Sequence, residues 1–321
     1  MKLHELQVEL GLNKPQTNGL LRWAPAPLRV FLADKRGVAG LAILLLLTAA
    51  ALGAPWLTEF PPDRMSAMPH LPPDGEHWLG TTRMGKDVFA QLLYGARASL
   101  TVGLLAGALA TLIGVFVGMC AGYFGGRLDD AISFIVNVAL VIPALPLIIV
   151  IASFVDSASP MVIGLVLAAT GWGWTARIIR AQTLQIRHKD FILAAQLLNE
   201  PWWRILAAHI LPNMLSLVVS GFVLTTIYAI LAEAGLEFIG LGDPSAVTWG
   251  TILFWGQQNS ALQVGAWWEI LPACFAIMLT GAALVLINFT VDEIANPLLR
   301  KRRGEKAVIA YLRKKGLPVN D

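Results

Sequence analysis

The feature that most constrains this chain is a set of long segments that contain no charged residue. Six of them are also strongly apolar: residues 37–58, 98–126, 131–155, 157–176, 205–232 and 270–291. About 20 helical residues cross the roughly 30 Å of hydrocarbon in a bilayer, and a helix satisfies its own backbone polar groups there. Only 14% of the chain is charged, against about 25% in a soluble domain. The sequence therefore predicts an all-α membrane protein with six transmembrane helices.

A seventh charge-free gap, Pro244 to Trp268, contains glycines and the polar run Gln257-Gln258-Asn259-Ser260. A continuous span seldom tolerates such a run at mid-depth. With six spans and both termini inside, 20 of the 24 Lys and Arg residues lie on the inner side, as the positive-inside rule requires. We therefore predict a multi-pass protein of the cell (inner) membrane with N- and C-termini in the cytoplasm. The segment 244–268 is then extracytoplasmic and either re-entrant or interfacial, with tryptophans suited to the interface: Trp249, Trp255, Trp267 and Trp268.

This topology divides the chain into a cytoplasmic N-terminus (1–36), a first transmembrane helix (37–58), an extracytoplasmic loop (59–97), a five-helix core (98–291) and a basic cytoplasmic tail (292–321). The core contains one long cytoplasmic loop, 177–212, and one extracytoplasmic loop, 233–268. An elbow helix is predicted from Leu20 to Arg36, with one apolar face that can lie on the membrane: Leu28, Phe31 and Leu32.

The spans themselves contain few candidates for chemistry. No Asp, Glu, Lys or Arg falls inside the six gaps, and Glu233 at the outer end of the fifth is the nearest. Ion-coupled transporters need ionisable groups near the membrane midplane, so this pattern argues against secondary transport. The candidate pathway residues are Asn137, Pro143, Ser220 and Glu233. Pro143 and Pro146 predict a kinked or broken third span. Ordinary helix packing is the alternative at each position.

Several other residues are interpreted as structural. Residues 80–86 match the G-x-x-x-x-G-K start of a phosphate-binding loop, but Asp87 follows where a Ser or Thr must hold Mg²⁺. We interpret this stretch as a glycine-turned cap before the second span, and we expect no cofactor bound by this chain. The remaining candidates are interpreted as solvated loop histidines (His4, His70, His77), a solvated acidic rim at the outer mouth (Glu233, Glu237, Asp243) and small core residues (Cys120, Cys274).

The cytoplasmic loop 177–212 is the most informative segment. Phe191, Ala194, Ala195 and Leu198 have the spacing of one face of a short helix. Asn199 follows at the position where a left-handed residue ends a helix. Pro201 then suits the first turn of a second helix, which continues with Trp202 and Trp203. Two short helices that meet at a tight corner form an apolar knob too small to make a core, so the knob either lies on the membrane or docks in a partner's groove.

The pattern Ala194-Ala195-x-x-x-Asn199, followed by His209-Ile210-Leu211-Pro212, resembles the EAA loop of importer-type ABC transporter permeases. It departs from that loop at Leu193 for Glu, Asn199 for Gly and His209 for Ile. Three other stretches are similar to the dipeptide/oligopeptide branch of the family: Leu79 to Leu100, Phe238-Ile239-Gly240-Leu241-Gly242 with Trp249-Gly250, and Asn296-Pro297-x-Leu299-Arg300. Together these stretches cover roughly residues 77–300 in the family's order.

The resemblance implies a MetI-like ABC permease core that is not itself an enzyme. It implies a dipeptide or oligopeptide importer in which this chain forms half of the pathway with a second, homologous permease subunit. An extracytoplasmic substrate-binding protein would deliver substrate, and two cytoplasmic ATPase subunits would carry ATP and Mg²⁺. The chain would contact membrane lipid, through Arg300–Arg303 in particular, and no nucleic acid. The implied ATPase-coupling residues are Asp190, Phe191, Ala194, Ala195, Leu198, Asn199, Pro201 and Trp202.

Two alternatives stay open from the sequence. Permeases of this branch also import oligosaccharides or nickel, and no residue decides between these substrates and peptides. An ATPase-independent secondary transporter is the other class.

Overall fold

The computed structural model describes residues 26–65, 67–154 and 159–295, and within these ranges the chain is helical apart from loops and one isolated β-bridge, Thr81 to Asp87. The helices are α2 (Ala26–Ala33), α3 (Lys35–Leu52), α4 (Ala54–Leu57), α5 (Val88–Phe124), α6 (Gly126–Val141), α7 (Ala144–Ser153), α8 (Pro160–Ile186), α9 (Asp190–Leu197), α10 (Trp202–Arg204), the π-helix η2 (Ile205–Ile210), the 3₁₀ helix η3 (Leu211–Met214), α11 (Leu215–Phe238), α12 (Trp249–Gln258), the 3₁₀ helix η4 (Trp267–Glu269) and α13 (Leu271–Ala295). The predicted all-α fold class is confirmed.

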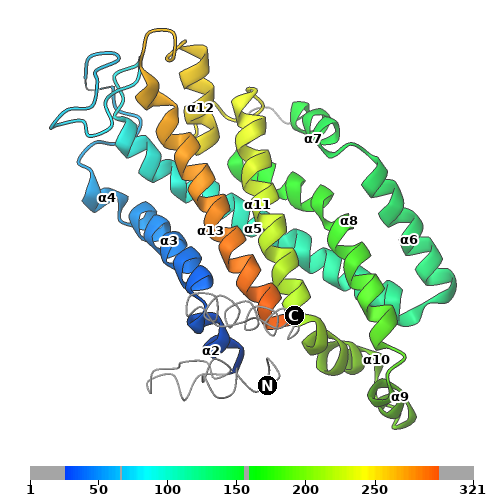
Figure 1. Cartoon of the computed structure of the whole chain (residues 1–321). Coiled ribbons are helices and arrows are strands. Elements are labelled where there is room, and N and C mark those ends of the chain that lie inside the picture. The colour runs from blue at the N-terminus through cyan, green and yellow to red at the C-terminus, as the bar shows by residue number, and fades with distance from the viewer. Residues whose placement is uncertain (1–25, 66, 155–158, 296–321) are drawn as a thin grey trace, which may run out of the picture.

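The long helices lie side by side in one bundle. The loop before α5 and helix α12 lie at one end of the bundle, whereas α2, α9 and α10 lie at the other (Figure 1). Five helical segments are long and apolar enough to cross a membrane, and a sixth is formed if α6 and α7, bent by 87° at their junction, count as one span. Pro143 lies at this junction, so the predicted break in the third span is confirmed.

The N-terminal elbow is present as α2, which turns into α3 at Asp34. The elbow residues before Ala26, His4, the Asn296–Arg300 motif and the predicted tail from residue 296 onward lie outside the described residues, whereas residues 292–295 of that tail belong to α13. Helix α5 begins at Val88, ahead of the charge-free segment that starts at residue 98. Arg97 therefore lies inside α5, where its guanidinium donates to the Ala51 and Leu52 carbonyls at the end of α3.

Helices α5 and α8 form the most extensive helix–helix contact among the described residues. Gly114, Gly118 and Gly122 of α5 are spaced by four residues and face α8. A Cβ atom at Gly118 would lie 2.5 Å from the Ala176 carbonyl oxygen. Small residues at this spacing let helix backbones meet in a membrane, where lipid provides no hydrophobic drive for association. On α5, Gly103 and Gly107 approach α11 in the same way, at Ile230 and Thr226.

The loop before α5 is the predicted glycine-turned cap. Gly80 and Gly85 have left-handed φ angles of 71° and 69°. Asp87 is the N-cap of α5, and its Oδ1 accepts a hydrogen bond of 2.6 Å from the Ala90 amide. Its Oδ2 lies 2.8 Å from Nδ1 of His77. The sequence thus predicted the cap correctly, but it did not predict the histidine that supports it.

The prediction of solvated histidines is wrong for His77, whereas His70 is partly exposed and paired. His77 is only 4% exposed because the loop folds over the start of α5 and the ring pairs with Asp87. His70 Nδ1 lies 2.6 Å from Oε1 of Glu269, a buried carboxylate in η4. Both histidines therefore hold the loop before α5 against the helix bundle.

The segment 244–268 does not form a continuous span, and it contains the short helix α12. A capping box of Thr248 and Thr251 starts this helix. The assignment of Trp249 to the membrane interface is wrong: it is 1% exposed, and its indole donates to the Leu92 carbonyl of α5. Trp267 is exposed. Helix α12 is thus packed onto α5 through its first residue.

The glycine contact between α5 and α8 makes a testable prediction. The substitution Gly118→Ala places a methyl group against a backbone carbonyl that cannot move aside, so it should lower the free energy of unfolding by about 1–3 kcal/mol. The matched control is Gly281→Ala in α13, where no neighbouring atom lies within 4 Å of the added Cβ. Unfolding midpoints in mild detergent measure both. Equal midpoints for the two variants would contradict the proposed role of the glycine contact.

Candidate functional site

The corner between α9 and α10 is built by a left-handed residue. Asn199 has φ 54° and directly follows the C-cap Leu198. Its amide donates to the Gln196 carbonyl at 3.0 Å, and the Glu200 amide donates to the Ala195 carbonyl at 3.1 Å. These two bonds form a Schellman motif, which satisfies the last carbonyls of a helix. The left-handed position predicted for Asn199 is therefore confirmed.

The second half of the corner is fixed by a proline and an ion pair. Pro201, with φ −65°, is the N-cap of α10 rather than a residue of its first turn. Glu200 Oε2 lies 3.0 Å from Nε2 of His209 and 3.6 Å from Nε of Arg204, both of which follow the corner. The Trp202 ring packs at 5.5 Å from the Phe124 ring at the end of α5. The corner is thus tied both to itself and to the bundle.

The connection into α11 is irregular, and a proline explains it. Pro212 has no amide hydrogen and cannot continue an α-helical ladder. The chain passes through the π-helix η2 and the 3₁₀ helix η3 before α11 starts at Leu215. Such π-helical turns recur at functional sites. The sequence indicated a helix here, but it contained no signal for the π-helical form.

One face of helix α9 is buried in the protein. Ile192 and Ala195 are buried in a cluster with residues of α5, α8 and η2. The sequence pattern placed Ala195 on one outward face with Phe191, Ala194 and Leu198. That prediction is wrong for Ala195, because its small side chain is buried in the contact between α9 and η2. Asp190 and Ala194 are exposed.

The exposed apolar side chains of this segment form what we call the α9–α10 surface: Phe191, Leu193, Leu197, Leu198, Trp202 and Trp203. Leu197 is 84% exposed. This surface lies at the end of the bundle opposite α12 (Figure 1). An exposed apolar group of this kind marks an interaction site in a native protein.

Two arginines join α5, α6 and α8 at the end of the bundle near α9. Arg180 of α8 donates through Nε and Nη2 to the Asp129 carboxylate of α6, at 2.5 and 2.7 Å. Arg187, the C-cap of α8, donates to the Gly122 carbonyl at the end of α5. These contacts connect the end of α8 to α5 and α6.

Two of the four pathway candidates lie on α6 and at its end. Asn137 is exposed and lines a cavity of about 170 Å³ between α5, α6 and α8, together with Ser133 and Arg177. Pro143 is exposed at the bend between α6 and α7.

The other two candidates are buried. Ser220 of α11 donates at 2.6 Å to Asp292 of α13, so its hydroxyl joins two helices. Glu233 and Glu237 are almost fully buried, and Glu237 accepts a hydrogen bond from Thr248 at the start of α12. The predicted solvated rim is therefore wrong for both glutamates, because α12 packs against α11 at Glu237 and Glu233 lies inside the helix bundle. Only Asp243 is partly exposed.

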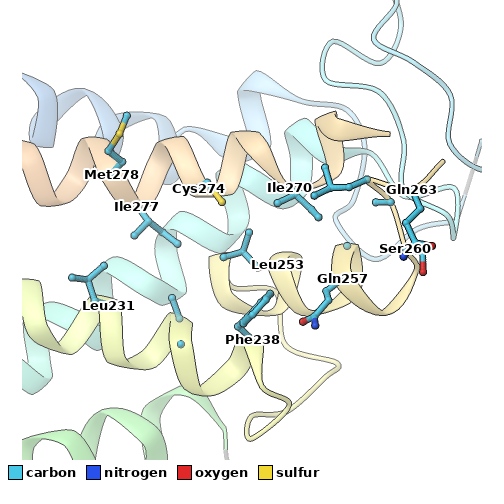
Figure 2. A pocket seen from close by; sticks show the side chains of 15 residues that line it. Leu231, Phe238, Leu253, Gln257, Ser260, Gln263, Ile270, Cys274, Ile277 and Met278 are labelled. Carbon is cyan, nitrogen blue, oxygen red and sulfur yellow. The ribbon is translucent and has the colours of Figure 1, made fainter. Parts of the chain in front are cut away.

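An apolar groove of about 720 Å³ lies between α11, α12 and α13. Leu231, Ile277 and Met278 line one end, while Gln257, Ser260 and Gln263 lie at the other, near the tip of α12 (Figure 2). Cys274 is exposed on this groove, which overturns its interpretation as a core residue; Cys120 is half-buried. Within the described ranges, no group of three or more His, Cys, Asp or Glu residues is placed to hold a metal ion.

Two family models match this chain. The model for the inner membrane component of binding-protein-dependent transport systems matches residues 110–304. The model for the N-terminal transmembrane domain of oligopeptide transport permease C matches residues 23–73.

Curated relatives match over most of the chain. The chain is 35% identical to the dipeptide transport system permease protein DppC of Bacillus subtilis (strain 168), over 84% of this chain and 83% of that protein. It is 34% identical to the oligopeptide transport system permease protein OppC of Mycobacterium tuberculosis (strain ATCC 25618 / H37Rv), over 84% of this chain and 92% of that protein.

A solved structure has the same fold. It is an inward-facing form of the MetNI methionine ABC transporter, with 22% identity and a TM-score of 0.51, over 64% of this chain and 94% of that chain.

The left-handed corner makes a second prediction. Asn199→Gly should leave the protein as stable as it is now, because glycine adopts positive φ freely. Asn199→Val should cost about 1–2 kcal/mol, since a β-branched side chain clashes in that conformation. Unfolding midpoints and protease sensitivity of the loop measure the difference. If valine is tolerated as well as glycine, the left-handed geometry does not hold the corner.

Proposed function

Because the chain belongs to the family of inner-membrane components of binding-protein-dependent transport systems, we propose that it is the permease subunit of an ABC importer for dipeptides or oligopeptides. The names of the relatives support the peptide substrate, since they are dipeptide and oligopeptide permeases at 32–35% identity. The single structural observation that carries the proposal is the α9–α10 surface on a stiff corner. A transport subunit without its own energy source needs such a contact.

In this proposal the α9–α10 surface is where a cytoplasmic ATPase docks. Its members include Phe191, Leu198 and Trp202, which are exposed and apolar. The buried or backbone-fixing residues act differently, because Ala195, Asn199 and Pro201 hold the shape of the corner. Asp190 begins α9, where its charge favours the helix N-terminus.

The orientation and partners follow from that assignment. The α9–α10 end faces the cytoplasm, and α12 with the loop before α5 faces outward. Two ATPase subunits bind ATP and Mg²⁺, and this chain binds neither. A second, homologous permease completes the pathway, in which Asn137 and Pro143 on the exposed side of α6 and α7 take part. An extracytoplasmic binding protein delivers the substrate to the outer face.

Mechanically, closure of the ATPases moves the two corners of the permease pair together. Rigid-body movement of packed helices about an interface is an established way of exposing a pathway. In this chain the corner is continuous with α8 and, through η2 and η3, with α11. Arg187 and Arg180 link the same region to α5 and α6. A push on α9 and α10 therefore reaches four membrane helices.

Transport assays test the substrate class. Vesicles that contain the complete complex and its binding protein should accumulate labelled dipeptides or oligopeptides in an ATP-dependent manner. Accumulation of an oligosaccharide or nickel instead would contradict the peptide assignment while keeping the importer role. Uptake by this chain alone, abolished by an uncoupler and independent of ATP, would contradict the importer role itself.

The third prediction concerns Leu197, the most exposed side chain of the α9–α10 surface. Leu197→Arg should leave folding unchanged and weaken ATPase binding by about tenfold or more, as loss of an apolar anchor at an interface does. Leu197→Met keeps an apolar side chain of similar size and is the matched control. Co-purification of ATPase and ATP-dependent uptake are measured in both variants. Normal coupling in Leu197→Arg would exclude this surface as the docking site.

A further inference from the structure

A second cavity lies at the outer end of the chain, away from the α9–α10 surface. Its volume is about 390 Å³, and it lies between α4, the loop that follows, and the start of α5. Its principal lining residues are Trp56, Trp78, Phe89, Glu59, Glu76 and Asp87. In Figure 1 this loop stands at the same end as α12. None of the pathway or coupling candidates lines it.

The walls of this cavity are aromatic. The Trp78 and Phe89 rings pack at 5.1 Å, tilted by 44°, so these side chains hold each other in place. Trp56 of α4 is 88% exposed, so its ring can contact a group that enters the cavity. Aromatic faces carry a negative potential that attracts guanidinium and ammonium groups. The walls are therefore already arranged to receive an organic cation.

The charged residues that line the cavity are all acidic. Glu59 and Glu76 are exposed at its lining, and no ion pair within the described ranges involves either carboxylate. The third carboxylate, Asp87, is already engaged by His77 and by the Ala90 amide. Among the described residues that line the cavity, none is basic. Two carboxylates are thus available to pair with a cation.

The aromatic walls and the two carboxylates together indicate which kind of cation the cavity binds. A phospholipid with an amine headgroup would bring its phosphate beside Glu59 and Glu76, and the lining contains no cation to neutralise it. A small isolated amine would leave the exposed Trp56 ring uncovered. A basic side chain on a protein surface satisfies both conditions, because the protein that carries it also covers the ring. Exposed tryptophans are typical anchors of such interfaces.

We propose that this cavity receives an arginine or lysine side chain of an extracytoplasmic partner protein, held between the aromatic walls and the carboxylates of Glu59 and Glu76. The inference rests on the proposed function to the extent that a substrate-binding protein is the partner that function requires on this side.

A small probe tests the cavity without any partner or ATPase. The purified chain is labelled with 5-fluorotryptophan in phosphatidylglycerol nanodiscs, and Trp56→Phe and Trp78→Phe assign the two ¹⁹F resonances. N-acetylarginine amide should shift both resonances, whereas N-acetylcitrulline amide, its uncharged analogue, should not. In Glu59→Gln/Glu76→Gln the affinity for the arginine probe should fall about three- to tenfold, the range for two exposed ion pairs. Asp63→Asn, an exposed acid of the same loop that does not line this cavity, is the matched control and should keep full affinity.

Three results would overturn the proposal. The first is the absence of a shift with the arginine probe, and the second is equal affinity in the double variant. The third is that phosphatidylethanolamine nanodiscs shift the same resonances and abolish the response to the probe, because the cavity would then hold a lipid amine.

The whole complex gives the second readout. With its binding protein, Glu59→Gln/Glu76→Gln should raise the concentration of binding protein that half-stimulates ATP hydrolysis about three- to tenfold, with an unchanged maximal rate. The dependence of that concentration on salt should also weaken, since exposed charge pairs are screened. An unchanged half-stimulating concentration would contradict the docking role. A wild-type complex that no binding protein stimulates would instead contradict the proposed function, whatever the arginine probe shows.

Discussion

The close approach of α5 and α8 is the contact on which the rest of the structure depends. Gly114, Gly118 and Gly122 bring the two backbones together, and such packing of small residues holds helices where lipid competes equally well for apolar side chains. Arg180 and Arg187 then connect the end of α8 to Asp129 of α6 and to the Gly122 carbonyl of α5. Because α8 runs directly into the corner, these contacts make the corner an extension of the membrane helices rather than a loop.

The corner itself is stiff because backbone hydrogen bonds and the contacts of Glu200 hold it on both sides of Asn199. The two hydrogen bonds of the Schellman motif end α9, and Pro201 is the N-cap of α10. The carboxylate of Glu200, between the two helices, contacts His209 of η2. Its buried apolar side chains therefore fix the shape of the corner, and its exposed apolar side chains can contact another protein. A flexible loop with the same exposed residues would absorb a push without passing it on.

The sequence predicted the fold class, the broken third span, the cap at Asp87 and the left-handed Asn199, because each depends on local chemistry: charge-free length, proline, an N-cap residue and a residue that tolerates positive φ. It failed wherever a distant segment decides burial. His77, Glu233 and Trp249 are polar or interfacial by type, yet all three are buried: the loop before α5 folds over His77, Glu233 lies inside the helix bundle, and Trp249 packs against α5. Ala195 faced outward in the sequence pattern, but η2, which follows the corner, packs against it. The π-helix of η2 had no sequence signal beyond Pro212.

The central claim is that the α9–α10 surface is the contact through which partner ATPases act on the membrane helices. A photocrosslinking amino acid placed at position 197, in cells that express the whole system, tests this claim most directly. We predict a covalent adduct with a nucleotide-binding subunit, and none when the same amino acid replaces Trp56 at the other end of the chain. An adduct with lipid or with the second permease at position 197, and none with the ATPase, would contradict the claim.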